Sequence, residues 1–148
     1  MATVTRNAWV DSTERLLKDA GHRASAPRAA ILELLGQQHC LLTAREITDR
    51  LRAQGRDVGT ATVYRALELL HSLGAVDRVD TGEGFARYEP ADPSGAHHHH
   101  HLLCAHCGRV SPFEDERLEQ AIAELSERLA YRVEGHDVVL RGACPNCA

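Results

Sequence analysis

The amino-acid sequence predicts an α+β fold in two parts: an N-terminal helical part that ends in a β-hairpin, and a small C-terminal α/β part with a four-cysteine zinc site. Apolar residues recur at helical spacing as far as Leu70, and after Gly74 the period changes to that of a strand. Two Cys-x-x-Cys pairs then occur in the second part, at Cys104, Cys107, Cys144 and Cys147. A chain of 148 residues is long enough for two small domains and too short for a large multidomain enzyme.

Four helices are predicted in the first part, beginning near Ser12, Ser25, Thr43 and Thr60. The first extends to Ala20, carries Leu16 and Leu17 on its apolar side, and ends at Gly21. Thr43 and Glu46 form a capping box that opens the third helix. The fourth helix has a buried stripe at helical spacing, made of Val63, Leu67 and Leu70.

A short hairpin is predicted directly after the fourth helix. The segments 76–79 and 85–88 have the two-residue period of strands, and residues 81–84 between them are a turn sequence. Helices followed by a hairpin are typical of a winged helix-turn-helix, which we expect over residues 1–90. Proline and glycine interrupt residues 91–96, which we expect to form a linker.

The second part, residues 97–148, is expected to combine short strands with one helix. Strands are predicted over residues 97–104, near Val110, and over residues 138–140, where the strand reads as buried. A helix is predicted over residues 114–131 from the apolar positions Leu118, Ile122, Leu125 and Leu129. So small a part buries little apolar surface, and it therefore commonly needs a metal ion or a partner chain.

The two Cys-x-x-Cys pairs predict a structural zinc site. Each pair lets two sulfurs of one turn approach the same ion, and the two pairs complete a tetrahedron. The alternatives are ordinary turns or a redox-active dithiol. Because no secretory signal is recognised, the cysteines are expected to be reduced, which favours metal binding over disulfides. The remaining cysteine, Cys40, is interpreted as a small half-buried residue.

Five consecutive histidines, His97 to His101, precede the first cysteine pair. Their internal position argues against an expression tag. In a strand, side chains alternate between the two faces, so His97, His99 and His101 are expected on one face and His98 and His100 on the other. One strand could therefore contribute to two separate metal sites. Further potential ligands are Glu89, Glu119 and His136.

Charge and composition exclude several classes of protein. The net charge of −4 argues against a protein that coats polyanions generally. The total conceals an asymmetry, because the balance is +2 over residues 1–71 and −4 over residues 92–148. No apolar run is long enough for a membrane span, so we expect a cytoplasmic protein with no membrane partner. No HExxH spacing or nucleophile pattern occurs, so we expect neither an enzyme nor a small-molecule substrate.

These features together resemble the ferric uptake regulator family of bacterial metal-dependent repressors, from about Leu16 to Cys147. The resemblance rests on the segment from Gly59 to Arg65, the histidine run and the two cysteine pairs. It implies a winged helix followed by a dimerisation domain. It also implies a homodimer that, when loaded with metal, binds palindromic double-stranded operator DNA and represses genes of metal uptake and homeostasis.

The resemblance assigns metal ligands residue by residue. The structural zinc would be bound by Cys104, Cys107, Cys144 and Cys147. The regulatory metal would be bound by Glu89, His99, His101 and His39, with Cys40 as the substitute for His39. An additional site would consist of His98, His100, Glu119 and His136.

The fourth helix would be the recognition helix and lie in the major groove. Contacts to DNA are expected from Arg23, Thr60, Thr62, Tyr64 and Arg65. Arg65 could pair with guanine through two hydrogen bonds or bind a phosphate, while Arg23 resembles a basic family position that approaches the minor groove.

The regulatory metal is expected to be ferrous iron, with zinc as the alternative. Glu89 resembles the iron-sensing pattern, and the cysteine that zinc-sensing members usually carry is replaced by Ala91. Asp77, by contrast, is a feature shared with zinc-sensing members. A peroxide sensor of the same family and a metal-storage module that does not bind DNA are further alternatives.

Overall fold

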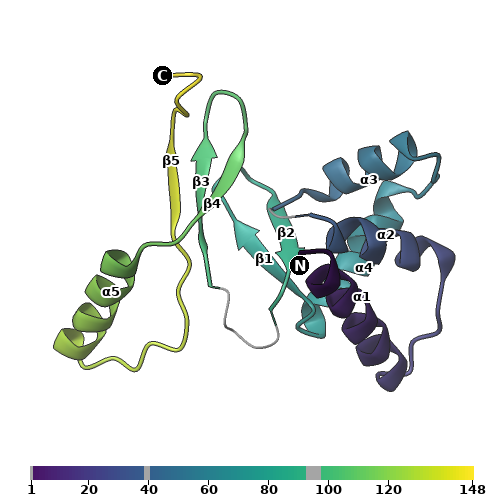
Figure 1. Cartoon of the computed structure of the whole chain (residues 1–148), viewed down its shortest axis with the longest axis horizontal. Coiled ribbons are helices and arrows are strands. Elements are labelled where there is room, and N and C mark those ends of the chain that lie inside the picture. The colour runs from purple at the N-terminus through teal and green to yellow at the C-terminus, as the bar shows by residue number, and fades with distance from the viewer. Residues whose placement is uncertain (1, 39–40, 93–97) are drawn as a thin grey trace. The chain divides into compact units, whose positions relative to one another are not determined.

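The computed structural model describes residues 2–38, 41–92 and 98–148, and it confirms the predicted α+β fold (Figure 1). The chain forms two compact units, Met1–Ala96 and His97–Ala148, which we call the first and the second unit. Residues 93–96 of the expected linker lie outside the described residues, as do His39, Cys40 and His97.

Three helices of the first unit begin where the sequence predicts: α2 (Ala26–Gly36), α3 (Ala44–Ala53) and α4 (Thr60–Ser72). The Ser25 hydroxyl accepts the Arg28 amide hydrogen at 3.3 Å and caps α2. The capping box of α3 is confirmed, because the Thr43 hydroxyl accepts from the Glu46 amide at 3.0 Å and the Glu46 carboxylate accepts from the Thr43 amide at 2.8 Å. The predicted stripe of α4 is fully buried in the core: Val63, Leu67 and Leu70.

Helix α1 (Ala2–Asp19) begins ten residues before the predicted start at Ser12. Its buried side passes through Trp9, Thr13 and Leu17, which are spaced four residues apart. The Trp9 indole donates to the Ala75 carbonyl at 3.1 Å and so fixes the helix to the residue directly before β1. The expectation that Leu16 packs inward is wrong, because the stripe that starts at Trp9 leaves Leu16 exposed.

The predicted hairpin consists of β1 (Val76–Asp80) and β2 (Ala86–Pro90), which pair antiparallel. Both strands extend one or two residues beyond the predicted ends, and Asp77 lies directly opposite Glu89. Leu42 adds an isolated bridge to Tyr88, with two backbone hydrogen bonds of 2.8 and 2.9 Å. The helices followed by this hairpin form a winged helix-turn-helix.

In the second unit, β3 (His100–Cys104) pairs antiparallel with β4 (Val110–Phe113) and parallel with β5 (Val139–Gly142). The prediction that residues 138–140 are buried is wrong for Leu140, which is 51% exposed. Leu140 pairs with Leu102, itself 43% exposed, so the described second unit leaves this part of the sheet uncovered.

Helix α5 (Glu116–Leu129) is capped by Asp115, whose carboxylate accepts the Leu118 amide hydrogen at 3.0 Å, and it ends at Ala130 in the left-handed conformation. None of its residues is buried, and Leu125 and Leu129 are strongly exposed. The helix is therefore amphipathic and without a covered apolar face in the described chain. No described helix has both the length and the hydropathy that crossing a bilayer requires.

Candidate metal centres and nucleic-acid interface

The first candidate metal centre lies where the turn after β3 meets the turn after β5. The Sγ atoms of Cys104, Cys107, Cys144 and Cys147 all lie within 4.8 Å of one another. The sulfurs of Cys107 and Cys144 are 3.8 Å apart. A tetrahedron with zinc–sulfur bonds of about 2.3 Å requires sulfur–sulfur distances of about 3.8 Å. A disulfide requires about 2.05 Å, so the arrangement fits a metal site and not a disulfide.

The electrostatics of this cluster also suit a cation. The amides of Cys107 and Cys144 donate to the Cys104 sulfur at 3.5 and 3.3 Å, and they lower the pKa of this thiol to about 5. Hydrogen bonding with the Cys144 and Cys104 side chains raises the pKa of Cys147 to about 12. Four thiolates cannot coexist at such distances without a compensating positive charge. The donor set therefore fits a dication that replaces the remaining protons.

A second candidate centre is built from β3, α5 and the segment before β5. Its ligand atoms come from His98, His100, Glu119 and His136 and lie within 4.8 Å of one another. Nε2 of His136 lies 2.8 Å from Glu119 and 3.2 Å from Nε2 of His98. Hydrogen bonding from His100 lowers the pKa of the Glu119 carboxyl, so this group is anionic near neutral pH. Three imidazoles and a carboxylate suit zinc, iron, nickel or manganese.

Within this centre, His100 has the most strongly fixed ring. The side chain is only 1% exposed, and the Val138 amide donates to Nδ1 at 3.2 Å. In the neutral ring this hydrogen bond leaves the proton on Nε2, which lies 2.6 Å from Glu119. A cation at Nε2 would displace that proton, so metal and proton compete for the same atom.

His99 and His101, the other two described histidines of the run, form a separate pair. The ring centroids of His99 and His101 are 4.9 Å apart, and those of His98 and His100 are 4.5 Å apart. The four described histidines thus fall into the two pairs that the predicted alternation gives, although β3 begins only at His100 and not at the predicted residue 97. Glu89, a proposed partner of His99 and His101, is a buried residue near the end of β2 in the first unit.

The candidate nucleic-acid interface is the exposed face of α4. Thr60, Tyr64 and Arg65 are exposed and Thr62 is half-buried. The Arg65 guanidinium contacts the Thr62 hydroxyl at 3.4 Å. Arg23 is exposed in the segment before α2, and its carbonyl accepts a hydrogen bond from Arg28 at 2.9 Å. The buried stripe of α4 fixes the helix in the core, so this polar face is presented to solvent by a rigid support.

The sequence pattern does not single out Arg87, a buried cation on β2. Its side chain is 6% exposed and pairs with two carboxylates, Glu83 and Glu46. The available signal was its position two residues before Glu89 on the same strand, because side chains so spaced share one face. Charge on the buried face of a strand requires partners.

Comparison with known proteins gives consistent matches along most of the chain. Residues 19–141 match the sequence model of the ferric uptake regulator family. A ferric uptake regulation protein of Legionella pneumophila is 38% identical over 132 residues, covering 88% of this chain and 95% of that protein. The crystal structure of the Vibrio cholerae ferric uptake regulator has a TM-score of 0.80 at 36% identity, covering 88% of this chain and 98% of the other. A Francisella tularensis ferric uptake regulator with iron has a TM-score of 0.76 at 26% identity, covering 86% and 95%.

Proposed function

The chain belongs to the ferric uptake regulator family of metal-dependent regulators, and we propose that it represses genes of metal uptake as a metal-loaded homodimer on palindromic operator DNA. The observation that carries this proposal is the combination, in one chain, of an exposed helix face suited to DNA with preorganised groups of metal ligands. A metal-storage module does not require an exposed helix face suited to DNA. A DNA-binding protein that does not respond to metals does not require groups of metal ligands.

We assign the two units different roles in this function. The first unit, with the linker after residue 90, would read DNA through Thr60, Thr62, Tyr64 and Arg65 in the major groove and through Arg23 near the minor groove. The second unit would dimerise. The exposed leucines of α5 and the uncovered pair Leu102 and Leu140 support this assignment, because contiguous exposed apolar surface marks interaction sites.

The four-cysteine cluster would hold a structural zinc ion. Four thiolates leave no open position for water or substrate, so the site would contribute folding free energy and no catalysis. This agrees with a second unit whose helix has no buried residue of its own.

The regulatory site would combine Glu89 with His99 and His101, completed by His39 or by Cys40. When bound, the cation supplies a cross-link between side chains on either side of the linker. Glu89 and the two histidines would then restrict how the units move relative to each other. In a twofold dimer this restriction would favour the separation of two recognition helices that matches half-sites about 34–36 Å apart. His98, His100, Glu119 and His136 would form an additional site.

Ferrous iron is the proposed co-repressor. Glu89 and the alanine at position 91 match the iron-sensing pattern of the family, and the relative from Francisella tularensis is a ferric uptake regulator with iron. The nitrogen and oxygen donors are compatible with ferrous iron, as they are with zinc, manganese and nickel. Zinc is the second candidate, because Asp77 lies opposite Glu89 in the hairpin and offers another carboxylate at that place, as in the zinc-sensing pattern.

The test compares metals and ligand variants on one DNA probe, a duplex selected from a randomised pool by the wild-type protein with Fe(II). Affinity is measured anaerobically with Fe(II), Zn(II), Mn(II) and Ni(II). We expect wild-type protein to bind most tightly with Fe(II). The double variant His99→Ala, His101→Ala should remain folded and dimeric but lose the metal dependence, while the exposed His106→Ala control keeps it. Metal-dependent binding by the double variant would refute the assignment, and tightest binding with Zn(II) would favour the zinc sensor.

A further inference from the structure

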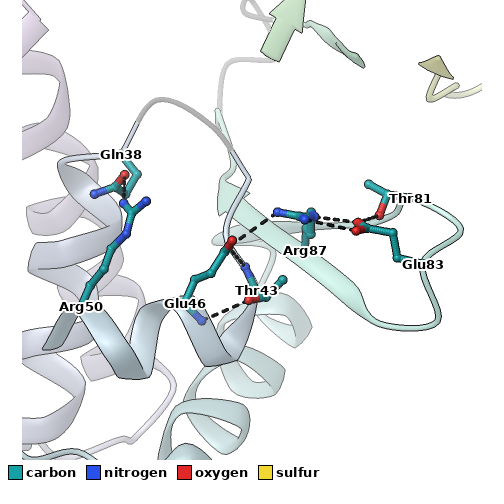
Figure 2. A network of polar contacts seen from close by, with 7 residues as sticks. All are labelled: Gln38, Thr43, Glu46, Arg50, Thr81, Glu83 and Arg87. Carbon is teal, nitrogen blue, oxygen red and sulfur yellow. Dashed lines mark hydrogen bonds and ion pairs between the residues drawn. The ribbon is translucent and has the colours of Figure 1, made fainter. Parts of the chain in front are cut away.

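The guanidinium of Arg87 joins three segments of the first unit (Figure 2). Its Nε and Nη2 donate to the two carboxylate oxygens of Glu83 at 2.8 and 3.3 Å, an arrangement with two parallel hydrogen bonds. Its Nη1 lies 3.6 Å from Glu46 Oε2. The hydroxyl of Thr81, which is fully buried, donates to the same Glu83 oxygen that accepts the hydrogen bond from Arg87 Nε. The turn of the hairpin, strand β2 and the start of α3 are thereby held through one buried cation.

Glu46 has two functions in this network. The oxygen that faces Arg87 also accepts the Thr43 amide hydrogen in the capping box of α3. Any movement of Arg87 therefore changes how strongly the Glu46 carboxylate is compensated by a positive charge. This carboxylate lies at the first turn of α3, where the helix dipole favours an anion. Helix α3 packs against α4, the proposed recognition helix.

A second polar contact reaches the same face of α3 from the other direction. Arg50 lies one turn after Glu46, and its Nη1 donates to Gln38 Oε1 at 2.5 Å. Gln38 directly precedes His39 in the chain, while Arg87 lies two residues before Glu89 on β2. Both segments of the first unit that carry proposed regulatory ligands are thus tied to α3 by charged side chains.

We propose that Arg87 is a positioning residue that couples metal binding at β2 to DNA binding, by fixing the hairpin and the start of α3 relative to the strand that carries Glu89. This inference rests on the proposed function. The side chains of residues 87 and 89 share one face of the strand and lie about 6.6 Å apart along it. A shift of the strand on metal binding is passed to Glu83 and Glu46, because separation of a buried guanidinium from these carboxylates removes charge pairing that offsets its desolvation. By linkage, the network would raise metal affinity on DNA by the same factor.

The alternative is a purely structural role, in which Arg87 stabilises the fold and leaves coupling untouched. Coupling is therefore the quantity to measure: the ratio of DNA affinity with Fe(II) to DNA affinity without metal, on the selected duplex described above. Thermal stability and the iron and zinc content of each variant are measured in parallel. A residue that only stabilises the fold changes the melting temperature and leaves this ratio as it is.

For Arg87→Gln we expect the ratio to fall about tenfold or more while zinc content stays at the wild-type value. Glu46→Gln keeps an oxygen for the Thr43 amide but removes the charge that faces Arg87, so we expect a smaller fall in a protein that folds normally. The matched control is Arg56→Gln, which removes an exposed ion pair with Glu33 at 2.8 Å in the same unit and should leave the ratio unchanged.

Three outcomes overturn the proposal. The first is an unchanged ratio in Arg87→Gln, with or without a lower melting temperature. If Arg87→Gln does not fold, an unchanged ratio in Glu46→Gln overturns it instead. The third is wild-type protein without any metal-dependent DNA affinity, which refutes the proposed function as well. Metal-dependent wild-type binding together with intact coupling in the variants refutes only the role of Arg87.

Discussion

His100 Nε2 lies 2.6 Å from Glu119 Oε1 and connects the histidine strand β3 to helix α5. Because His100 is buried and its other ring nitrogen is engaged by Val138, this pair fixes where His98 and His136 find a common ligand position. The pair thus makes α5 part of the second candidate metal centre as well as an amphipathic surface. Loss of the Glu119 carboxylate should therefore affect both the candidate metal centre and the surface of α5.

Replacement of Glu119 by glutamine should remove one metal equivalent per chain from this centre. The carboxylate is the one negatively charged group of this centre, and an amide cannot replace its charge. Loss of a group that supports a metal site typically lowers metal affinity about 10–100-fold. Titration with Zn(II), followed by metal analysis after gel filtration, measures the stoichiometry. The control is Glu116→Gln, an exposed acid on the same helix. Equal stoichiometry in wild type and Glu119→Gln would show that the centre does not hold metal through this residue.

Much of the fold could be predicted because local chemistry specifies it. The Thr43–Glu46 capping box is read from four consecutive residues and the stripe Val63, Leu67 and Leu70 from eight, and the structure contains both as predicted. The predicted start of α1 at Ser12 is ten residues late, because the indole of Trp9 is held by a hydrogen bond to Ala75, which is 66 residues away in the chain. Local signals cannot anticipate such a long-range contact.

Residue type and strand period predict candidate metal ligands, and the family resemblance groups them into sites, but neither predicts the residues that support them. Nothing in the sequence pairs His100 with Val138 or Arg87 with Glu46, since these partners come from segments about forty residues away. Leu140 illustrates the opposite error. Its apolar run reads as buried, yet burial depends on whether another surface covers the sheet, which a sequence pattern does not report.

Replacement of Cys104 by serine should abolish zinc binding by the four-cysteine cluster and destabilise the second unit selectively. Apparent binding free energies of structural zinc sites are on the order of 10 kcal/mol. A unit of this size does not have enough folding free energy to remain folded after such a loss. We expect zinc to fall from about one equivalent to near zero, with loss of helical circular dichroism from α5. The fluorescence of Trp9, the single tryptophan, should still report a folded first unit. His106→Ala, inside the same Cys-x-x-Cys turn, should retain zinc; a stable, zinc-free Cys104→Ser protein would contradict the structural role.

Replacement of Arg65 by alanine should weaken binding to the selected duplex by about 1–3 kcal/mol. The dependence on salt separates the two possible contacts. If Arg65 binds a phosphate, the slope of log affinity against log salt decreases by about one; if it reads guanine, the slope stays and sequence preference relaxes. Arg128→Ala, an exposed arginine on α5, serves as the control. Wild-type affinity in Arg65→Ala would remove this residue from the interface.

The stability of the first unit should depend on pH through Glu83. Hydrogen bonding from Arg87 lowers the pKa of this carboxyl in the folded protein, so its stabilising effect is complete above the pKa of the unfolded chain, about 4.3. The effect is lost as the pH falls from there through the lower, folded value. Glu83→Gln should flatten this acid limb in unfolding curves followed by Trp9 fluorescence. Glu33→Gln, at the exposed ion pair with Arg56, should leave it steep. An equally steep limb in Glu83→Gln would contradict the assignment.

Introduction of a charge into the exposed stripe of α5 should convert the protein from a dimer to a monomer. Leu125 and Leu129 are 42% and 57% exposed in the single chain. Because full burial of a leucine contributes about 1.5–3 kcal/mol, burial of the exposed half of each side chain contributes about 1 kcal/mol. The double variant Leu125→Glu, Leu129→Glu replaces this gain with the cost of desolvating two carboxylates. Analytical ultracentrifugation at several concentrations measures the dissociation constant directly.

The matched control for this experiment is Gln120→Glu. Gln120 is exposed on the same helix and lies on the side opposite Leu118 and Ile122, so it adds a like charge without touching the stripe. The control should remain dimeric with normal zinc content. If the leucine variant is dimeric at the same concentrations and retains its zinc, another surface of the second unit must hold the dimer together. The uncovered pair Leu102 and Leu140 on the sheet would then be the next surface to substitute.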